Sequence, residues 1–429
     1  MISSIAASLD RRLDPASAEP LALGFSGGGD SLALLTASLA WAGAHGRRVL
    51  ALTVDHQLHP DSAAWTREAG AVAERLGADW RGLAWTGDKP ARGLPAAARL
   101  ARHRLLAEAA RKAGAQVLLL GHTATDIAES DLMRTDVTPQ LGRLRDWAPS
   151  PVWPEGRGVF ILRPLLGLTR AELRAWLAGQ GLGWREDPAN DDPRFARARA
   201  RAALGEDASA IPDGSSSLAA WLNAGRIGAA GEIVLSRGRL RAGPDAEARR
   251  VLAASLLCAS GGETPPRAGE VARLYERLAG EGDLAATLAG ARVVSNNDAV
   301  LLVREPRRAG RAEPVLPLLA GATGVFDGRF EVTAAEPLTV VTLAGRAARL
   351  GDADRRQLAK IDAPVRPSLP CLITEGGEVA LPAPFGAGPA IAHALAPLRW
   401  TSALGGIDDE RALAEFSLRN LVTPGEVSA

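Results

Sequence analysis

The sequence of 429 residues contains only two cysteines, Cys258 and Cys371, and they stand far apart. This scarcity argues against a disulfide framework and against the paired Cys-x-x-Cys spacing of structural zinc sites. Long apolar runs are also missing, since none reaches the roughly 20 residues of a membrane-spanning helix. The N-terminus lacks the basic-then-apolar pattern of a signal peptide. We therefore expect a cytoplasmic protein without a membrane partner.

Net charge is nearly absent as well, at +1, so overall charge does not indicate a nucleic-acid partner. Lysine occurs at three positions only, and most of the arginine excess reflects a composition rich in Ala, Arg and Gly. The distribution of charge is more informative, because dense arginine at 194–201 follows the acidic stretch 187–192. Apolar residues make up 47% and charged residues 23%, which is typical of globular proteins. The length predicts two or three domains.

The first two hundred residues alternate short apolar runs with amphipathic runs. Strands are predicted at 21–25, 48–54, 80–85 and 116–121, and helices at 31–44, 61–77 and 94–113. This alternation predicts an α/β domain with a parallel sheet flanked by helices. In such sheets, ligands bind beyond the carboxyl ends of the strands.

The remainder of the chain changes character twice. Thr169 and Glu172 form a capping box that predicts a helix to about Gln180. The turn-rich stretch 205–217 is a candidate linker, 218–280 reads as helical, and short apolar runs from about 288 predict strands. We therefore expect an α/β domain at 1–204, a mainly helical middle domain at 205–285 and a β-rich C-terminal domain at 286–429.

A glycine-rich segment, Ser26-Gly-Gly-Gly-Asp-Ser31, directly follows the first predicted strand. Its bare backbone allows several N–H groups to converge on an anion, and the positive end of the following helix favours the same anion. The lysine of a Walker A loop is missing. A strand-to-helix turn without a ligand is the alternative, but the flanking polar side chains favour a nucleotide site. The predicted nucleotide-binding residues of this loop are Ser26, Gly27, Gly28, Gly29, Asp30 and Ser31.

Polar side chains also follow two other strands at the same edge. Asp55 comes after the second strand, and the stretch from His122 to Glu129 comes after the fourth. Asp126 and Glu129 are three residues apart, so a helix places them on one face, where they can hold a metal ion or an amine. The alternative for this pair is a solvated helix start stabilised by the helix dipole. For His122, a role in the core and a role in the site are evenly matched.

The glycine loop is similar to the signature of the N-type ATP pyrophosphatases, which share the PP-loop, adenine nucleotide alpha hydrolase-like fold. Within that class the chain resembles the tRNA(Ile)-lysidine synthetase family. Four segments carry this second resemblance: a strand ending in Asp-His at 54–62, an Ala-Arg-x-x-Arg helix at 97–104, a His-x-x-x-Asp-x-x-Glu stretch at 121–130, and Asp-Pro-x-Asn followed by Arg-x-Arg-x-Arg at 187–201. The resemblance covers residues 20 to about 204.

The resemblance implies a reaction. ATP activates C2 of the wobble cytidine in the CAU anticodon of a tRNA(Ile), with release of pyrophosphate. The ε-amino group of free L-lysine then displaces AMP and gives lysidine. The implied cofactors are ATP and Mg²⁺, and family analogy adds a homodimer.

The resemblance also implies roles for individual residues. Asp30, Asp126 and Glu129 would be catalytic, with Mg²⁺ at Asp30 and Asp126. ATP binding would involve the glycine loop together with Thr53, Asp55, Arg99 and His122. Contacts to tRNA would come from Arg194, Arg197, Arg199 and Arg201, because guanidinium groups match phosphates.

Three features depart from the family pattern. Thr125 stands where the family has a first Asp, Ile127 replaces a polar residue, and 135–140 lacks the usual Arg-Gly-Ser-Gly loop. These departures favour one alternative, a catalytically silent tRNA-binding paralogue. A second alternative, a tRNA 2-thiolase, would need paired reactive cysteines near the loop. A GMP or asparagine synthetase would need an early cysteine nucleophile, which the sequence lacks.

Overall fold

The computed structural model describes residues 2–132, 144–186, 199–200, 203–204, 218–306 and 312–421. The chain forms two compact units. Unit 1 contains Met1–Ser216 and Ile407–Arg419, and unit 2 contains Ser217–Gly406 and Asn420–Ala429. The division into three domains at 204 and 285 stays a prediction.

Unit 1 is built on a six-stranded sheet with the strand order β3-β2-β1-β4-β6-β5. All neighbouring strands are parallel except the edge strand β5, which pairs antiparallel with β6. The strands are β1 (Leu21–Gly24), β2 (Val49–Asp55), β3 (Asp79–Ala84), β4 (Val117–Leu120), β5 (Trp147–Pro149) and β6 (Phe160–Leu162). The four predicted strands and the α/β fold are confirmed. β1, β2 and β4 are mostly apolar and almost entirely buried, as expected of strands covered on both faces.

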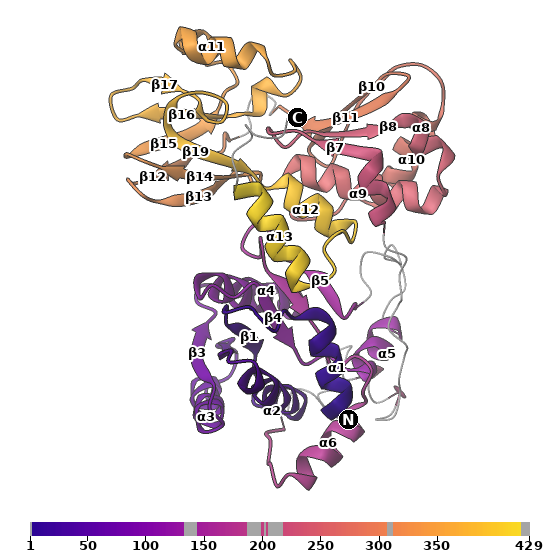
Figure 1. Ribbon diagram of the computed structural model, residues 1–429, viewed down its shortest axis with the longest axis vertical. Helices are drawn as coiled ribbons and strands as arrows, with labels where there is room; N and C mark the ends of the chain where they lie inside the picture. Colours follow the sequence, from indigo (N-terminus) through magenta and orange to yellow (C-terminus); the bar gives the residue numbers. More distant parts are fainter. Residues whose placement is uncertain are drawn as a thin grey trace. The chain divides into compact units, whose positions relative to one another are not determined.

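Helices cover both faces of this sheet (Figure 1). α4 lies on one side of the strands, and α2 and α3 lie on the other, as expected when the strand order reverses between β3 and β4. The helices of unit 1 are α1 (Ile2–Arg12), α2 (Gly29–Ala44), α3 (Ser62–Arg75), α4 (Leu94–Lys112), α5 (Ala124–Leu132), α6 (Arg170–Gly179) and α13 (Glu410–Leu421). The three predicted helices and the capped helix at 170–179 are confirmed.

Unit 2 begins with a region that was expected to be helical and is only partly so. Its elements are η2 (Ala219–Ala224), β7 (Gly225–Ile227), β8 (Ile233–Ser236), α8 (Arg237–Ala242), α9 (Asp245–Ser260) and α10 (Ala268–Ala279). β7 and β8 form a hairpin, and β8 also pairs with β11 (Ala299–Arg304) about 65 residues later. That long-range pairing explains the difference, because no local pattern in the sequence encodes it.

The rest of unit 2 is rich in strands, as predicted. β9 (Leu284–Leu288) and β10 (Ala291–Ser295) complete the first sheet, whose order is β7-β8-β11-β10-β9. Two four-stranded sheets follow, with the orders β12-β15-β16-β17 and β13-β14-β19-β18. Their strands are β12 (Leu316–Leu318), β13 (Thr323–Phe326), β14 (Phe330–Ala334), β15 (Leu338–Thr342), β16 (Pro370–Thr374), β17 (Val379–Ala380), β18 (Pro382–Ala383) and β19 (Gly388–Ala394). The helical elements among them are η3 (Ala347–Arg349), α11 (Asp352–Ala359), η4 (Arg366–Ser368) and α12 (Ala396–Ala403).

In the described part of the chain, none of the helices has the length and apolar character that crossing a bilayer requires.

Most of the last helix, α13, belongs to unit 1, although it follows Ser217–Gly406 of unit 2 in sequence. Glu410 at its start accepts two hydrogen bonds from Arg47, Nη1 to Oε2 at 2.7 Å and Nη2 to Oε1 at 2.8 Å. Both side chains are buried, at 1% and 3% exposure. The backbone N–H of Asp14 donates to the same carboxylate, and the Trp147 indole donates to the carbonyl of Ile407. A buried bidentate ion pair therefore holds the start of the C-terminal helix on the six-stranded sheet of unit 1.

We expect Arg47→Ala to lower the free energy of unfolding by about 3–5 kcal/mol, because it leaves the Glu410 carboxylate buried without a counter-charge. Urea unfolding measures this loss. Arg48→Ala is the matched control, since Arg48 forms an exposed pair with Asp79 and should change stability by less than about 1 kcal/mol. Equal losses in the two variants would contradict the structural importance of the buried pair.

Candidate active site

The glycine loop lies where β1 turns into α2. Gly27 has a φ of +81°, a conformation that side chains other than glycine rarely adopt, and Gly28 is the N-cap of α2. Serine hydroxyls brace the turn: Ser31 Oγ donates to the carbonyl of Gly28 at 2.9 Å and lies 3.1 Å from Ser26 Oγ. The loop therefore holds a fixed shape without any ligand.

The backbone N–H groups of this loop point to its function. Within the part of the chain that the structure describes, the N–H groups of Gly27, Gly29, Asp30 and Ser31 have no protein acceptor. Three of them belong to the first turn of α2, where a helix leaves its N–H groups unsatisfied and its dipole is positive. This cradle of unused donors suits the oxygens of a phosphate or pyrophosphate group.

Two neighbouring segments pack closely on the loop. A Cβ at Gly121, just after β4, would lie 3.2 Å from the backbone of Asp30, so glycine is needed for this approach. On the other side the N–H of Arg185 donates to the carbonyl of Gly27, and a Cβ at Gly29 would lie 3.3 Å from the Trp184 ring. Glycine therefore serves both the anion cradle and the contacts that fix its position.

The three predicted catalytic carboxylates meet at one arginine that the sequence reasoning missed. Arg170 Nε lies 3.1 Å from Asp30 Oδ2, Nη2 lies 2.8 Å from Asp126 Oδ1, and Nη1 lies 2.7 Å from Glu129 Oε1. Arg170 is buried, and so are Asp126 and Glu129. The structure thus brings Asp30 of the glycine loop together with the acidic pair of α5.

Burial and charge act in opposite directions in this cluster. Burial raises the pKa of Asp30, with a contribution from Asp126, and the Arg170 guanidinium offsets this only in part. Burial alone would lower the pKa of Arg170, but Asp126, Glu129 and Asp30 outweigh it and raise that pKa. Arg170 is therefore a permanent cation, held among three carboxyl groups.

A signal for Arg170 was present in the sequence. Thr169 caps α6, and Glu172 completes the capping box, as predicted. Arg170 then occupies the first helical position, where the positive end of the helix dipole disfavours a cation. A buried cation in such a place needs anionic partners, and these partners come from 140, 44 and 41 residues away in the sequence.

The residues at the end of β2 support the turn that follows it. Asp55 Oδ1 accepts the N–H of Gln57 at 2.7 Å, and Thr53 Oγ1 accepts the Trp80 indole N–H at 3.0 Å. β2 continues three residues beyond its last pair with β1, which joins Gly24 to Leu52. The backbone of β2 from Thr53 to Asp55 therefore extends beyond the end of β1, next to the glycine loop.

Basic side chains gather at the neighbouring strand ends. His122, after β4, is buried, and its Nδ1 lies 3.2 Å from Nε of Arg163, which follows β6. Burial lowers the pKa of Arg163 to about 10, and the charge of Arg99 on α4 adds to this shift, with Asp146 opposing it. Among the described residues, Arg163 forms no ion pair with a carboxylate. A buried cation without an acidic partner favours an anionic ligand.

His103 on α4 belongs to the same group. It is 3% exposed, and neither ring nitrogen has a hydrogen-bond partner in the described chain. Burial, together with the charges of Arg102, Arg99 and Arg163, lowers the pKa of His103 to about 2. The ring is therefore neutral at physiological pH.

Two of the departures from the family pattern lie in the interior. Thr125 and Ile127 are both fully buried, and the Thr125 hydroxyl has no partner among the described residues. Position 125 therefore adds no charge to the cluster around Arg170. The departure at 135–140 lies outside the described residues. So do Arg194, Arg197 and Arg201, whereas Arg199 is described and exposed.

The donor set offers a divalent cation hard oxygen ligands. In the described chain no cluster of three or more His, Cys, Asp or Glu side chains is arranged to hold a metal ion. Mg²⁺ usually takes one or two carboxylates together with phosphate oxygens and water. Asp30 and Asp126, which reach the same guanidinium, fit that pattern in their chemistry.

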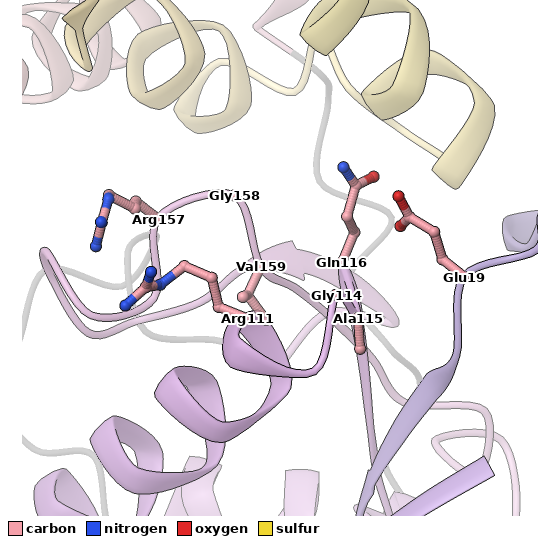
Figure 2. Close-up of a pocket in the computed structure, with 8 residues that line it drawn as sticks. All are labelled: Glu19, Arg111, Gly114, Ala115, Gln116, Arg157, Gly158 and Val159. Atoms are coloured by element: carbon pink, nitrogen blue, oxygen red, sulfur yellow. The ribbon is translucent and has the colours of Figure 1, made fainter. Parts of the chain in front are cut away.

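A separate hollow of about 260 Å³ lies at the opposite edge of the sheet (Figure 2). Its lining residues precede β1, β4 and β6, so it lies at the amino ends of the strands. Figure 2 shows Arg111 and Arg157 at one end and Glu19 at the other. Because parallel sheets bind nucleotides at their carboxyl ends, this hollow is not the nucleotide site.

Comparison with known proteins agrees with the geometry. Residues 1–208 match the family model described as the PP-loop domain. The match and the glycine loop after β1 together define the class, a PP-loop enzyme that uses ATP.

Individual relatives narrow the class. The tRNA(Ile)-lysidine synthase of Caulobacter vibrioides is 50% identical over 420 residues, which cover 95% of this chain and 99% of that protein. The enzyme of the same name from Hyphomonas neptunium is 38% identical over 338 residues, covering 73% and 89%. That from a Bradyrhizobium species is 36% identical over 332 residues, covering 68% and 92%. The chain belongs to the tRNA(Ile)-lysidine synthase family, as the sequence motifs indicated.

The neutral, buried state of His103 predicts a pH dependence of stability. Below about pH 6.5 the unfolded chain binds a proton that the folded site rejects, so stability falls as the pH drops toward 2. Between pH 7.5 and 5.5, His103 should cost about 1.4 kcal/mol of unfolding free energy. Urea unfolding of His103→Phe should lack this part of the pH dependence. The exposed His393, changed to Phe, is the control. Identical pH profiles for the native chain and His103→Phe would contradict this interpretation.

Proposed function

We propose that this chain catalyses ATP-dependent ligation of free L-lysine to C2 of the wobble cytidine in the CAU anticodon of tRNA(Ile), forming lysidine. The reaction would take place in the cytoplasm, and the proposal includes a homodimer by family analogy. The observation that carries the proposal is that an anion-binding loop and an acidic cluster lie together at the carboxyl ends of the parallel strands. An anion cradle with unused N–H groups lies beside a cluster of three carboxylates, of which Asp126 and Glu129 are buried.

The cradle suits the first step. The O2 atom of the cytidine attacks the α-phosphorus of ATP, the bond to the bridging oxygen breaks, and pyrophosphate leaves. The N–H groups of Gly27, Gly29, Asp30 and Ser31 would hold that pyrophosphate, as fixed donors that need no reorganisation. The backbone edge of β2 beyond Leu52 offers hydrogen-bonding groups for the adenine.

The basic group at the ends of β4 and β6 suits the charge that develops on the α-phosphate. Arg163 contacts His122, and Arg99 is near enough for its charge to act on Arg163, so these three residues would face the phosphates of ATP. A guanidinium group forms two parallel hydrogen bonds to phosphate and stabilises the transition state by its charge. Asp30, together with phosphate oxygens and water, would hold Mg²⁺, which would neutralise further charge on the phosphate. Asp126, the second candidate ligand, is then left to the amine.

The acidic cluster suits the second step. The ε-amino group of lysine attacks C2 of the adenylated cytidine, the C2–O bond breaks and AMP leaves. Asp126 and Glu129 would position the incoming ammonium, and one of them would accept the proton that it loses. Their burial strengthens both interactions, because little water competes for the carboxylates.

The thiolase alternative conflicts with the two cysteines. Both thiols are buried, Cys258 in α9 and Cys371 in β16. Burial raises the pKa of Cys258 to about 12 and that of Cys371 to about 11, so neither is a thiolate at physiological pH. The silent-paralogue alternative is disfavoured by the intact cradle and by the complete carboxylate cluster.

The direct test incubates the chain with tRNA(Ile) transcript, ATP and labelled lysine, followed by mass analysis of the nucleosides. We expect lysidine, with one pyrophosphate released per lysidine.

Asp30→Ala should lower pyrophosphate release by roughly 100-fold or more, because a carboxylate beside the leaving group is lost. It should still fold, since Arg170 keeps two partners. Asp79→Ala, at the amino end of β3 and therefore away from the carboxyl ends of the strands, is the matched control. Full turnover by Asp30→Ala would refute the role of the loop.

The basic element 194–201 predicts a salt dependence of tRNA binding. We propose that Arg194, Arg197, Arg199 and Arg201 contact tRNA phosphates. Replacing Arg197 and Arg201 by Ala should weaken tRNA binding and lower the slope of log K against log salt by roughly 1.4 to 1.8, since each lost phosphate contact removes about 0.7–0.9. Filter binding across salt concentrations measures the slope. An unchanged slope would assign these arginines a structural role instead.

A further inference from the structure

Arg170 connects the two halves of the site in space. Its Nε contacts Asp30 at the start of α2, and its two Nη atoms contact Asp126 and Glu129 on α5. Every nitrogen of the guanidinium is thus bound to a different carboxylate. The nucleotide loop and the amine-binding pair therefore share one cation.

The shared cation makes the two halves interdependent. A guanidinium is a rigid, planar fork, so it cannot optimise its contacts to three carboxylates independently. Because the guanidinium of Arg170 contacts all three carboxyl groups, any new charge at one end changes what the other end holds. Burial amplifies the effect, because Glu129 is 0% exposed and Asp126 is 5% exposed.

We propose that Arg170 is a positioning residue that couples nucleotide binding in the glycine loop to lysine binding at Asp126 and Glu129. This inference rests on the proposed function. In the empty site the guanidinium occupies the carboxylates that the substrate ammonium needs. The polyphosphate of ATP, bound beside Asp30, attracts the guanidinium toward the loop. Asp126 and Glu129 then become available to the ε-ammonium of lysine.

The sign of the coupling follows from this exchange. Without nucleotide, lysine competes with an arginine that is already in place and fully charged, so binding is weak. When nucleotide is bound, the Arg170 guanidinium interacts with the polyphosphate and competes less for the carboxylates, so lysine binds more tightly. By thermodynamic linkage, lysine strengthens nucleotide binding by the same factor. The amine would therefore enter after the nucleotide.

Calorimetric titration with lysine tests the coupling without turnover. The native chain is titrated with and without a saturating non-hydrolysable ATP analogue and Mg²⁺. We expect the analogue to tighten lysine binding by roughly 10-fold, within the usual range of such couplings. In Arg170→Gln the competing cation is gone, so lysine should bind about equally well with and without the analogue. Its affinity without the analogue should exceed that of the native chain.

Two further variants keep the experiment decisive. Arg170→Lys retains the charge and keeps the site folded should Arg170→Gln prove unstable in thermal melts. Its compact ammonium cannot serve three carboxylates, so the effect of the analogue should fall below about 3-fold. Arg157→Gln removes a partly buried arginine at the opposite edge of the sheet (Figure 2) and should keep the native ratio.

The outcomes separate the inference from the proposed function. If folded Arg170→Gln and Arg170→Lys keep the native 10-fold ratio, Arg170 is a static brace and the coupling is wrong, while lysine ligation stands. If lysine binds the native chain equally with and without the analogue, the coupling is also wrong. If the native chain binds no lysine with the analogue and tRNA(Ile) present, the proposed function fails together with the coupling.

Discussion

The charged centre of unit 1 depends on one buried guanidinium. Asp30, Asp126 and Glu129 all lie within hydrogen-bonding distance of the same guanidinium. Without that positive charge between them, the three carboxylates would repel one another strongly. Arg170 lies between them and donates to each one. The position of α6, the first turn of α2 and the start of α5 are fixed with respect to each other through this residue. The shape of the site is therefore an electrostatic consequence of Arg170.

The fold explains why the charged groups meet. β1, β2, β4 and β6 are parallel, so the segments that follow them all start at one edge of the sheet. Residues far apart in sequence, such as Asp30, Asp126 and Arg163, arrive at this edge without any special connection. Apolar strand residues are buried beneath them and supply a rigid base. The charged residues of the candidate site thus lie at the carboxyl ends of the strands, and the buried apolar residues of the strands supply the stability.

Prediction from sequence succeeded where information was local. The glycine loop, the acidic pair of α5 and the capping box of α6 are encoded within a few residues, and each was found. Arg170 was missed because its meaning lies in partners that only the folded sheet brings near. The hairpin β7–β8 was missed for the same reason, since β11 completes it. The return of Glu410 to Arg47, across 363 residues, has no local signature at all.

The site has two electrostatic poles, and the chain separates them within a few residues. His122, at the end of β4, contacts Arg163, and Arg163 and Arg99 form the cationic pole. Asp126, one helical turn later, belongs to the anionic pole. Phosphate and ammonium groups are attracted to opposite poles, so in the proposed reaction a nucleotide and an amine would approach from different sides of the β4 end. A reaction that joins an adenylated base to an amine needs this separation, because like-charged binding sites would bring one substrate and repel the other.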